Sequence, residues 1–143
     1  MTVQFMSTPE EVASCYPVMV QLRPHLSREG FLAAVIRQRE QGYRLAGAVD
    51  AGGKVAAVAG FRFFDALAWG RILYVDDLVT DEARRSQGLG QALFDFLVAL
   101  ARQEGCDEFH LDSGVQRFDA HRFYLRNRMR ISSHHFALPL ATR

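Results

Sequence analysis

A short segment with two glycines carries the clearest chemistry in this sequence. It reads RSQGLGQ over residues 85–91, and we call it the glycine turn. Glycine lets the backbone bend sharply, so Gly88 and Gly90 would leave the neighbouring main-chain N–H groups uncovered. If a helix starts here, its first N–H groups lack partners within the helix and carry partial positive charge. The glycine turn therefore predicts a binding site for a phosphate or pyrophosphate.

Two elements must position this turn. Before it, residues 72–80 read ILYVDDLVT, a short and nearly unbroken apolar run that predicts a buried strand. After it, apolar residues recur at the spacing of one helix face, at Leu89, Leu93, Phe96, Leu97 and Leu100. The pattern is thus a strand, a glycine turn and an amphipathic helix.

Two well-known phosphate-binding motifs do not fit the glycine turn. The dinucleotide fingerprint needs a small residue three positions after Gly90, where Leu93 stands. The ATP-type loop ends in Gly-Lys-Ser/Thr, and nothing similar follows Gly88. The pattern that remains is Arg-x-x-Gly-x-Gly, although an unrelated nucleotide-phosphate binder stays open as an alternative.

Composition narrows the class of protein. The 143 residues are 49% hydrophobic and 23% charged, which is typical of one soluble globular domain over residues 1–143. The net charge of +1 gives no reason to expect nucleic acid or an acidic membrane as a partner. No signal peptide and no apolar run of about 20 residues stands out. We therefore expect a cytoplasmic protein with two reduced cysteines, Cys15 and Cys106.

The remaining elements predict a mixed α/β domain. Thr8 and Ser27 are suited to cap two helices, of which the second stops at Gly42. Residues 43–50 and 54–64 predict two strands joined by a glycine-rich hairpin turn. After the amphipathic helix we expect a strand over residues 107–114, a helix over residues 119–128 and a last strand over residues 134–140. The predicted order is α-α-β-β-β-α-β-α-β.

The glycine turn resembles the acetyl-CoA-binding motif of the GNAT superfamily of N-acetyltransferases, Arg/Gln-x-x-Gly-x-Gly/Ala between a strand and a helix. Arg85, Gly88 and Gly90 match that motif. The segment DAHRFYLRNRM is similar to the family's next motif, at Ala120, Phe123 and Tyr124. The resemblance implies a mixed, mostly antiparallel central sheet with helices on both faces. It also implies direct transfer of the acetyl group from acetyl-CoA to a primary amine of a small-molecule acceptor, in a ternary complex.

The resemblance also implies where acetyl-CoA would bind as a co-substrate. The amides from Gln87 through Gln91 would hold the pyrophosphate, with charge added by Arg84 or Arg85. A strand edge offers unpaired N–H and C=O groups, which would pair with the pantetheine arm between splayed strands. The implied cofactor-binding residues are Leu78, Val79, Thr80, Arg85, Gln87, Gly88, Leu89, Gly90 and Gln91.

Three residues are candidates for catalysis. By resemblance, Tyr124 would protonate the leaving thiolate, whereas its sequence context alone equally allows simple packing beside Phe123. Asp76 and Asp77 interrupt an apolar strand, where a carboxylate is costly unless it is paired, hydrated or used. Period two places them on opposite faces of the sheet. For each aspartate, polarising the acceptor amine and pairing with an arginine remain open.

Four residues cluster where the acceptor would enter, namely Asp112, Ser113, Arg117 and His121. Arg117 could hold a carboxylate or phosphate of the acceptor, and Asp112 an ammonium group, although each alone is also suited to the surface. The spacing of His110, His134 and His135 matches no strong metal signature, so we expect no structural zinc and assign no metal ligand, while a metal that bridges to the substrate stays open. The resemblance allows a homodimer involving the last strand. The alternative function is a non-catalytic acyl-CoA-binding or sensor domain.

Overall fold

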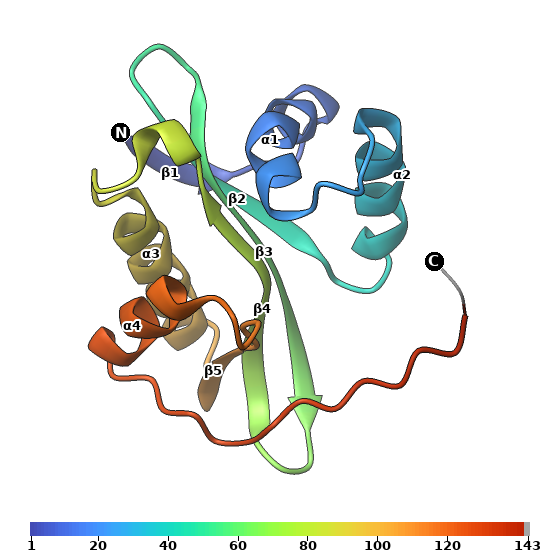
Figure 1. Cartoon of the computed structure of the whole chain (residues 1–143), viewed down its shortest axis with the longest axis vertical. Coiled ribbons are helices and arrows are strands. Elements are labelled where there is room, and N and C mark those ends of the chain that lie inside the picture. Colours follow the sequence, from blue (N-terminus) through green and yellow to red (C-terminus); the bar gives the residue numbers. More distant parts are fainter. Residues whose placement is uncertain (142–143) are drawn as a thin grey trace. The chain divides into compact units, whose positions relative to one another are not determined.

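The computed structural model describes residues 1–141 of the chain (Figure 1). The elements in chain order are β1 (Thr2–Phe5), α1 (Pro9–Leu22), α2 (Arg28–Arg39), β2 (Arg44–Val49), β3 (Val55–Ala66), β4 (Gly70–Thr80), the short 3-10 helix η1 (Glu82–Arg84), α3 (Leu89–Gln103), β5 (Glu108–Leu111) and α4 (Phe118–Arg126). The chain divides into a first compact unit, Met1–Leu111, and a second unit that begins at Asp112. A single domain over the whole length stays a prediction.

The first unit contains one five-stranded sheet with the order β1-β2-β3-β4-β5. The first three neighbouring pairs are antiparallel, and only β4 and β5 run parallel. The register of β5 covers β4 from Ile72 to Val75 and goes no further. The predicted mixed and mostly antiparallel sheet is therefore confirmed, and β5 pairs with β4 over part of its length.

Helices cover both faces of this sheet, as predicted (Figure 1). On one face, α1 and α2 bury residues such as Met19, Phe31 and Leu45 in a shared core. On the other face, α3 packs Leu93 and Leu97 against β-strand residues that are mostly alanines, phenylalanines and leucines. Each fully buried large apolar side chain contributes about 1.5–3 kcal/mol of transfer free energy, so the two cores hold the sheet between its helices.

Local capping fixes where the first two helices begin. The Thr8 hydroxyl accepts a hydrogen bond from the Glu11 N–H at 3.2 Å, and the Glu11 carboxylate accepts one from the Thr8 N–H at 3.0 Å. Ser27 accepts a hydrogen bond from the Gly30 N–H at 3.0 Å and starts α2. Gly42 has a φ of 88°, the left-handed conformation that glycine adopts easily. The predicted starts of these helices are confirmed, and α2 ends at Arg39, three residues before the predicted stop at Gly42.

Two predictions about strands are wrong. No strand is expected before the first helix, yet β1 pairs with β2 at one edge of the sheet. The last strand was expected over residues 134–140, but within the part of the chain described here no strand follows α4. Apolar and other side chains alternate in those residues as they do in a strand. A strand also needs a neighbouring strand to pair with its N–H and C=O groups, and the alternation alone does not supply one. Among residues 1–141, no helix is both long and apolar enough to cross a bilayer.

Candidate active site

The glycine turn leads directly into α3 and leaves the helix start uncapped. Gly88 is the N-cap residue, with a φ of 76°, and no side chain caps the helix. The Gly88 carbonyl accepts the first helical hydrogen bond, from the Ala92 N–H at 3.0 Å. The N–H groups of residues 89–91 therefore precede the first hydrogen bond within the helix. This is the predicted geometry for binding an anion.

The two arginines before the glycines have different surroundings. Arg84 donates to Asp50 in the β2–β3 turn, with 2.7 Å between Nη1 and Oδ2. The pKa of Asp50 is lowered by the Lys54 backbone hydrogen bond and next by the Arg84 side chain. Arg85 is exposed to solvent. Its charge is therefore available to a ligand, whereas Arg84 is already paired.

The end of β4 presents main-chain groups beside this helix start. The Asp81 N–H donates to the Ala56 carbonyl of β3 at 2.8 Å. Hydrogen bonding alternates along antiparallel strands, so every second residue of β4 directs its N–H and C=O groups toward β3. Val79 is such a residue. The main-chain groups of its neighbours, Leu78 and Thr80, point away from β3. A Cβ placed on Gly90 would lie 3.4 Å from Thr80 Oγ1, so the strand end and the helix start are adjacent. The predicted cofactor residues are thus brought together within the first unit.

A bulge in β4 determines where the two aspartates point. Gly60 pairs with Asp77 and the next residue of β3 pairs with Val75, so Asp76 is an extra residue in the ladder. Val75 and Leu78, on either side of the aspartates, both belong to the core under α3. The Asp77 carboxylate instead contacts Arg23 at the end of α1 and Tyr43 before β2. The Asp76 carboxylate contacts Arg62 of β3, whose neighbours Phe61 and Phe63 belong to the core under α3, so Arg62 lies on the other face. The prediction of opposite faces is wrong because the extra residue breaks the period of two.

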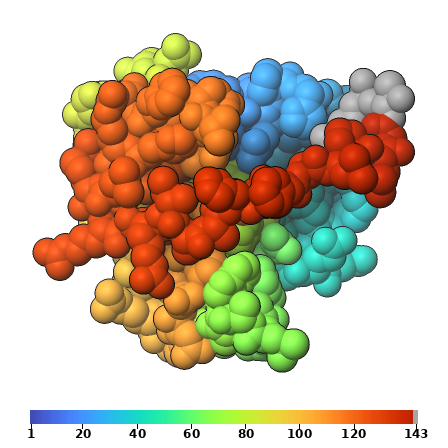
Figure 2. Space-filling view, turned by 60° about the horizontal axis from the view of Figure 1, so that its bottom comes forward, coloured from blue at the N-terminus to red at the C-terminus, as the bar shows by residue number. Residues whose placement is uncertain are grey.

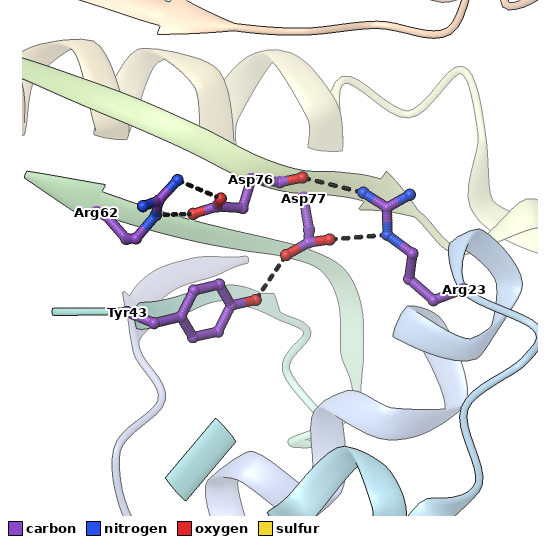
Figure 3. Close-up of polar contacts among 5 residues, drawn as sticks. All are labelled: Arg23, Tyr43, Arg62, Asp76 and Asp77. Atoms are coloured by element: carbon purple, nitrogen blue, oxygen red, sulfur yellow. Dashed lines mark hydrogen bonds and ion pairs between the residues drawn. The ribbon is translucent and has the colours of Figure 1, made fainter. Parts of the chain in front are cut away.

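Both aspartates belong to one polar cluster, which Figure 3 shows and which we call the arginine–aspartate cluster: Arg23, Tyr43, Arg62, Asp76 and Asp77. Arg62 donates two hydrogen bonds of 2.9 Å to the Asp76 carboxylate. Asp77 accepts one from Arg23 Nε at 2.9 Å and one from the Tyr43 hydroxyl at 2.7 Å. Arg23 also donates to the Asp76 carbonyl at 3.0 Å. The open alternative of arginine pairing is therefore realised for both aspartates.

Burial sets the proton affinities in this cluster. Burial raises the pKa of Asp76, against the opposing effect of the Arg62 hydrogen bonds. Burial, followed by the charge of Asp77, raises the pKa of Tyr43 well above its usual value, so this hydroxyl stays protonated and donates. Each carboxylate oxygen that accepts one hydrogen bond keeps capacity for a second. The cluster can therefore still attract a cation or orient a water molecule.

The structure adds Arg23, Tyr43 and Arg62 to the residues that the sequence singled out. They lie up to 54 positions away from their aspartate partners along the chain, so no local spacing connects them. The only signal in the sequence was the pair of carboxylates inside an apolar strand. That signal predicted that partners exist, but it did not identify them.

The other predicted residues lie in the second unit. Tyr124 is on α4, with its ring centroid 5.6 Å from that of Phe123. Burial raises the pKa of Tyr124, opposed by the charge of Arg117. Tyr124 is therefore protonated at neutral pH, as a proton donor must be.

The acceptor-side candidates lie in the segment before α4 and in its first turns. Arg117 is the N-cap residue of this helix, and His121 Nε2 lies 2.7 Å from the Gly114 carbonyl oxygen. Asp112 lies 3.5 Å from His135 Nδ1. The Ser113 hydroxyl is buried without a hydrogen-bond partner among the described residues. No group of three or more metal-binding side chains forms in residues 1–141.

Comparison with known proteins agrees with this arrangement. The acetyltransferase (GNAT) family matches residues 7–128. An uncharacterized N-acetyltransferase of Bacillus subtilis (strain 168), YhdJ, is 34% identical over 119 residues, which cover 83% of this chain and 84% of that protein. Two solved structures with the same fold are a ribosomal-protein-alanine N-acetyltransferase from Brucella melitensis biovar Abortus 2308 (14% identity, TM-score 0.83, 98% of this chain and 100% of that one) and glucosamine-6-phosphate N-acetyltransferase from Arabidopsis thaliana (19% identity, TM-score 0.76, 99% and 100%). The chain therefore belongs to the GNAT acetyltransferase family.

Proposed function

We propose that this protein transfers the acetyl group of acetyl-CoA directly to a primary amine of a small-molecule acceptor, in a ternary complex. One observation carries the proposal: the edge of β4 that β5 leaves uncovered ends beside the uncapped start of α3. A linear ligand with amide groups and a pyrophosphate matches that order of strand edge and helix start. The two cysteines form no disulfide, which is consistent with a protein that works in the reducing cytoplasm.

In this proposal the first unit binds acetyl-CoA. Main-chain groups of Leu78 and Thr80 pair with the pantetheine arm, because they point away from β3. The amides from Gln87 through Gln91 hold the pyrophosphate, and Arg85 adds a positive charge. Val79 contributes by fixing the strand to β3. Binding therefore depends mainly on backbone groups, which only a change of backbone or an added Cβ would disturb.

The chemical step is nucleophilic attack of the neutral amine on the thioester carbonyl. The tetrahedral intermediate collapses, the C–S bond breaks, and the thiolate takes a proton from the Tyr124 hydroxyl. The amine nitrogen loses one proton, which Asp76 or Asp77 accepts through water in the arginine–aspartate cluster. In this proposal Asp112, Ser113, Arg117 and His121 would hold the acceptor. The amide product and free coenzyme A then leave, and solvent restores the protons.

The glycine turn gives the sharpest test, because the chain offers a matched control. Gly88 and Gly105 both have a left-handed φ, of 76° and 71°, and an added Cβ would meet no atom within 4 Å at either position. Alanine at either site should cost about 1–2 kcal/mol of folding free energy from backbone strain. Only Gly88→Ala should also raise the KM for acetyl-CoA, at least tenfold, by placing a methyl group where the pyrophosphate binds. Equal KM values in the two folded variants would contradict the proposed binding site.

A non-catalytic acyl-CoA sensor is the second candidate, favoured by one observation. Both aspartates of the arginine–aspartate cluster already have arginine partners, so neither is an uncommitted base. Release of free thiol from acetyl-CoA across a panel of small amines separates the candidates. Turnover with one amine that falls strongly in Tyr124→Phe supports the enzyme. Tight coenzyme A binding without turnover on any amine supports the sensor.

A further inference from the structure

Arg23 keeps hydrogen-bonding capacity that the arginine–aspartate cluster does not use. A guanidinium carries its N–H donors in a rigid planar fork, and a carboxylate or phosphonate can accept from two neighbouring donors at once. Arg23 donates from Nε to the Asp77 carboxylate at 2.9 Å and from Nη2 to the Asp76 carbonyl at 3.0 Å. In Figure 3 the remaining nitrogen, Nη1, points away from both aspartates. Among residues 1–141 Nη1 has no partner, so the edge formed by Nη1 and Nη2, which we call the free edge, has a pair of donors available.

The existing contacts hold the Arg23 side chain in place. Its partners belong to β4, which pairs with β3 along most of its length. At the main chain Arg23 is the C-cap residue of α1, and its N–H donates to the Met19 carbonyl at 3.0 Å. Since both ends of the residue are held, little conformational freedom remains to be lost when a ligand binds to the free edge. The Arg23 side chain is 41% exposed, and α1, blue in Figure 2, is in view at the surface.

Arg62, the other arginine of the cluster, is committed more fully. It gives both of its hydrogen bonds to the Asp76 carboxylate. Its guanidinium carbon also lies 5.4 Å and 5.3 Å from the ring centres of Phe64 and Tyr74, whose faces attract the same charge. Arg23, in contrast, gives one of its two hydrogen bonds to a neutral carbonyl. More of the positive charge of Arg23 therefore remains available to a ligand.

The free edge lies beside the carboxylates that take a proton from the acceptor in the proposed function. Arg23 contacts the side chain of Asp77 and the main chain of Asp76, so a site for an anion is adjacent to the groups that attract an amine. An acceptor that carries an amine and, a few bonds away, an anionic group complements both charges. An acceptor with an amine alone would use only one of them.

We propose that the free edge of Arg23 binds an anionic group of the acceptor, a carboxylate or a phosphonate, and so selects amines that carry such a group nearby. Two parallel N–H···O bonds to one oxyanion supply energy and a fixed orientation. Arg23 is then a specificity-determining residue, and the aspartates keep their role in proton transfer. The sequence allows the same role for Arg117, which is the alternative that the test separates. The inference rests on the proposed function and names its class of substrate.

Thiol release from acetyl-CoA with matched amines tests this assignment. Glycine and aminomethylphosphonate are each compared with methylamine, β-alanine and aminoethylphosphonate with ethylamine, and leucine with isopentylamine. The quantity measured is the ratio of kcat/KM between the anionic amine and its counterpart without the anion, because damage to the chemical step lowers both values alike. In the natural protein at least one ratio should reach about 10- to 100-fold, the effect of hydrogen bonds to a charged group. The carboxylate and phosphonate arms show which anion is preferred.

Variants assign the preference to a residue. Arg23→Gln removes the free edge and keeps an amide donor for Asp77, and the ratio should fall below about threefold. Arg23→Lys keeps the charge without the paired N–H groups and should lower the ratio as well. Arg39→Gln is the matched control, because it removes the same charge from the last turn of α2, where Arg39 donates to the Ser7 carbonyl at 2.6 Å, and its ratio should not change. Urea unfolding checks that each variant is folded.

The possible failures are distinguishable. A high ratio that persists in both Arg23 variants, or that falls in Arg117→Gln instead, contradicts the assignment to Arg23. Turnover of amines without a preference for the anionic member of any pair refutes the inference and leaves the proposed function intact. Absence of turnover with every amine refutes the proposed function, and this inference with it.

Discussion

The contact between Gly60 and Tyr43 allows a sharp prediction about stability. Gly60 lies opposite Asp77 in the ladder between β3 and β4, and the Tyr43 ring lies over it. A Cβ on Gly60 would overlap the Tyr43 hydroxyl oxygen and lie 2.7 Å from Cε1, where ordinary contact begins at about 3.4 Å. Tyr43 is only 4% exposed, so its ring has little room to move aside. Gly60→Ala should therefore push the hydroxyl away from Asp77.

Two effects determine the size of the loss. A hydrogen bond to a charged group contributes about 1.5–3 kcal/mol, and overpacking a well-packed core costs typically another 1–3 kcal/mol. We expect Gly60→Ala to lower the free energy of unfolding by roughly 2.5–6 kcal/mol on these values. Tyr43→Phe removes the hydrogen bond without the overlap, so it should cost about 1.5–3 kcal/mol.

Urea unfolding of the natural protein, Gly60→Ala, Tyr43→Ala and the double variant checks this reasoning. In a Tyr43→Ala background the ring is gone, so adding Gly60→Ala should lower the free energy of unfolding by less than about 1 kcal/mol. The difference from its effect in the natural protein would show a strong coupling between the two sites. Gly47→Ala on β2 is the matched control, because its Cβ would come no closer than 3.1 Å to the Met6 side chain and would be in ordinary contact with the Ala57 carbonyl oxygen, at 3.6 Å. If Gly60→Ala costs no more than Gly47→Ala, or costs the same with and without the Tyr43 ring, the predicted overlap is wrong.

Three further predictions concern other parts of the first unit. Thr8→Ala removes the capping box of α1 and should cost about 0.5–2 kcal/mol in urea unfolding, whereas an unchanged midpoint would show that the cap contributes nothing. Burial raises the pKa of the Cys15 thiol to about 12, so a disulfide reagent should modify only Cys106 quickly in the folded protein, and rapid modification of both thiols would disagree with the core. The folded-state pKa of Asp50 is depressed below 3.8, so its stabilising effect is complete above that value and is lost as the pH falls through the folded pKa. The stability difference between the natural protein and Asp50→Asn should therefore shrink in that acid range, and a difference independent of pH down to about 2 would contradict this assignment.

Features that depend on local chemistry could be predicted from the sequence. Thr8 and Ser27 cap their helices through residues three positions away, and Gly88 adopts the left-handed conformation that the glycine turn requires. The apolar spacing after Leu89 identifies the buried face of α3 in the same way. Each of these signals lies within a few residues of the feature that it predicts.

Features that depend on distant partners could not be predicted. β1 is an edge strand of four residues without a strong apolar pattern, and only its pairing with β2 defines it. The extra residue at Asp76 arises from the register between β3 and β4, which one strand's sequence does not contain. The partners of Asp77 come from the end of α1 and the residue before β2. Two carboxylates inside an apolar strand indicated a site, and only the tertiary structure shows how they are paired.

The bulge at Asp76 also restricts how this strand can change. Leu73 and Val75 before it and Leu78 after it all pack into the core under α3, because the extra residue keeps the two parts of the strand in phase. Deleting that one residue would turn one part of β4 over, so that the side chains it directs into the core under α3 would point to the opposite face of the sheet. Substitutions within β4 are therefore easier to accommodate than any change in the number of its residues. Shortening the strand by one residue would destabilise the fold even if every proposed site residue were kept.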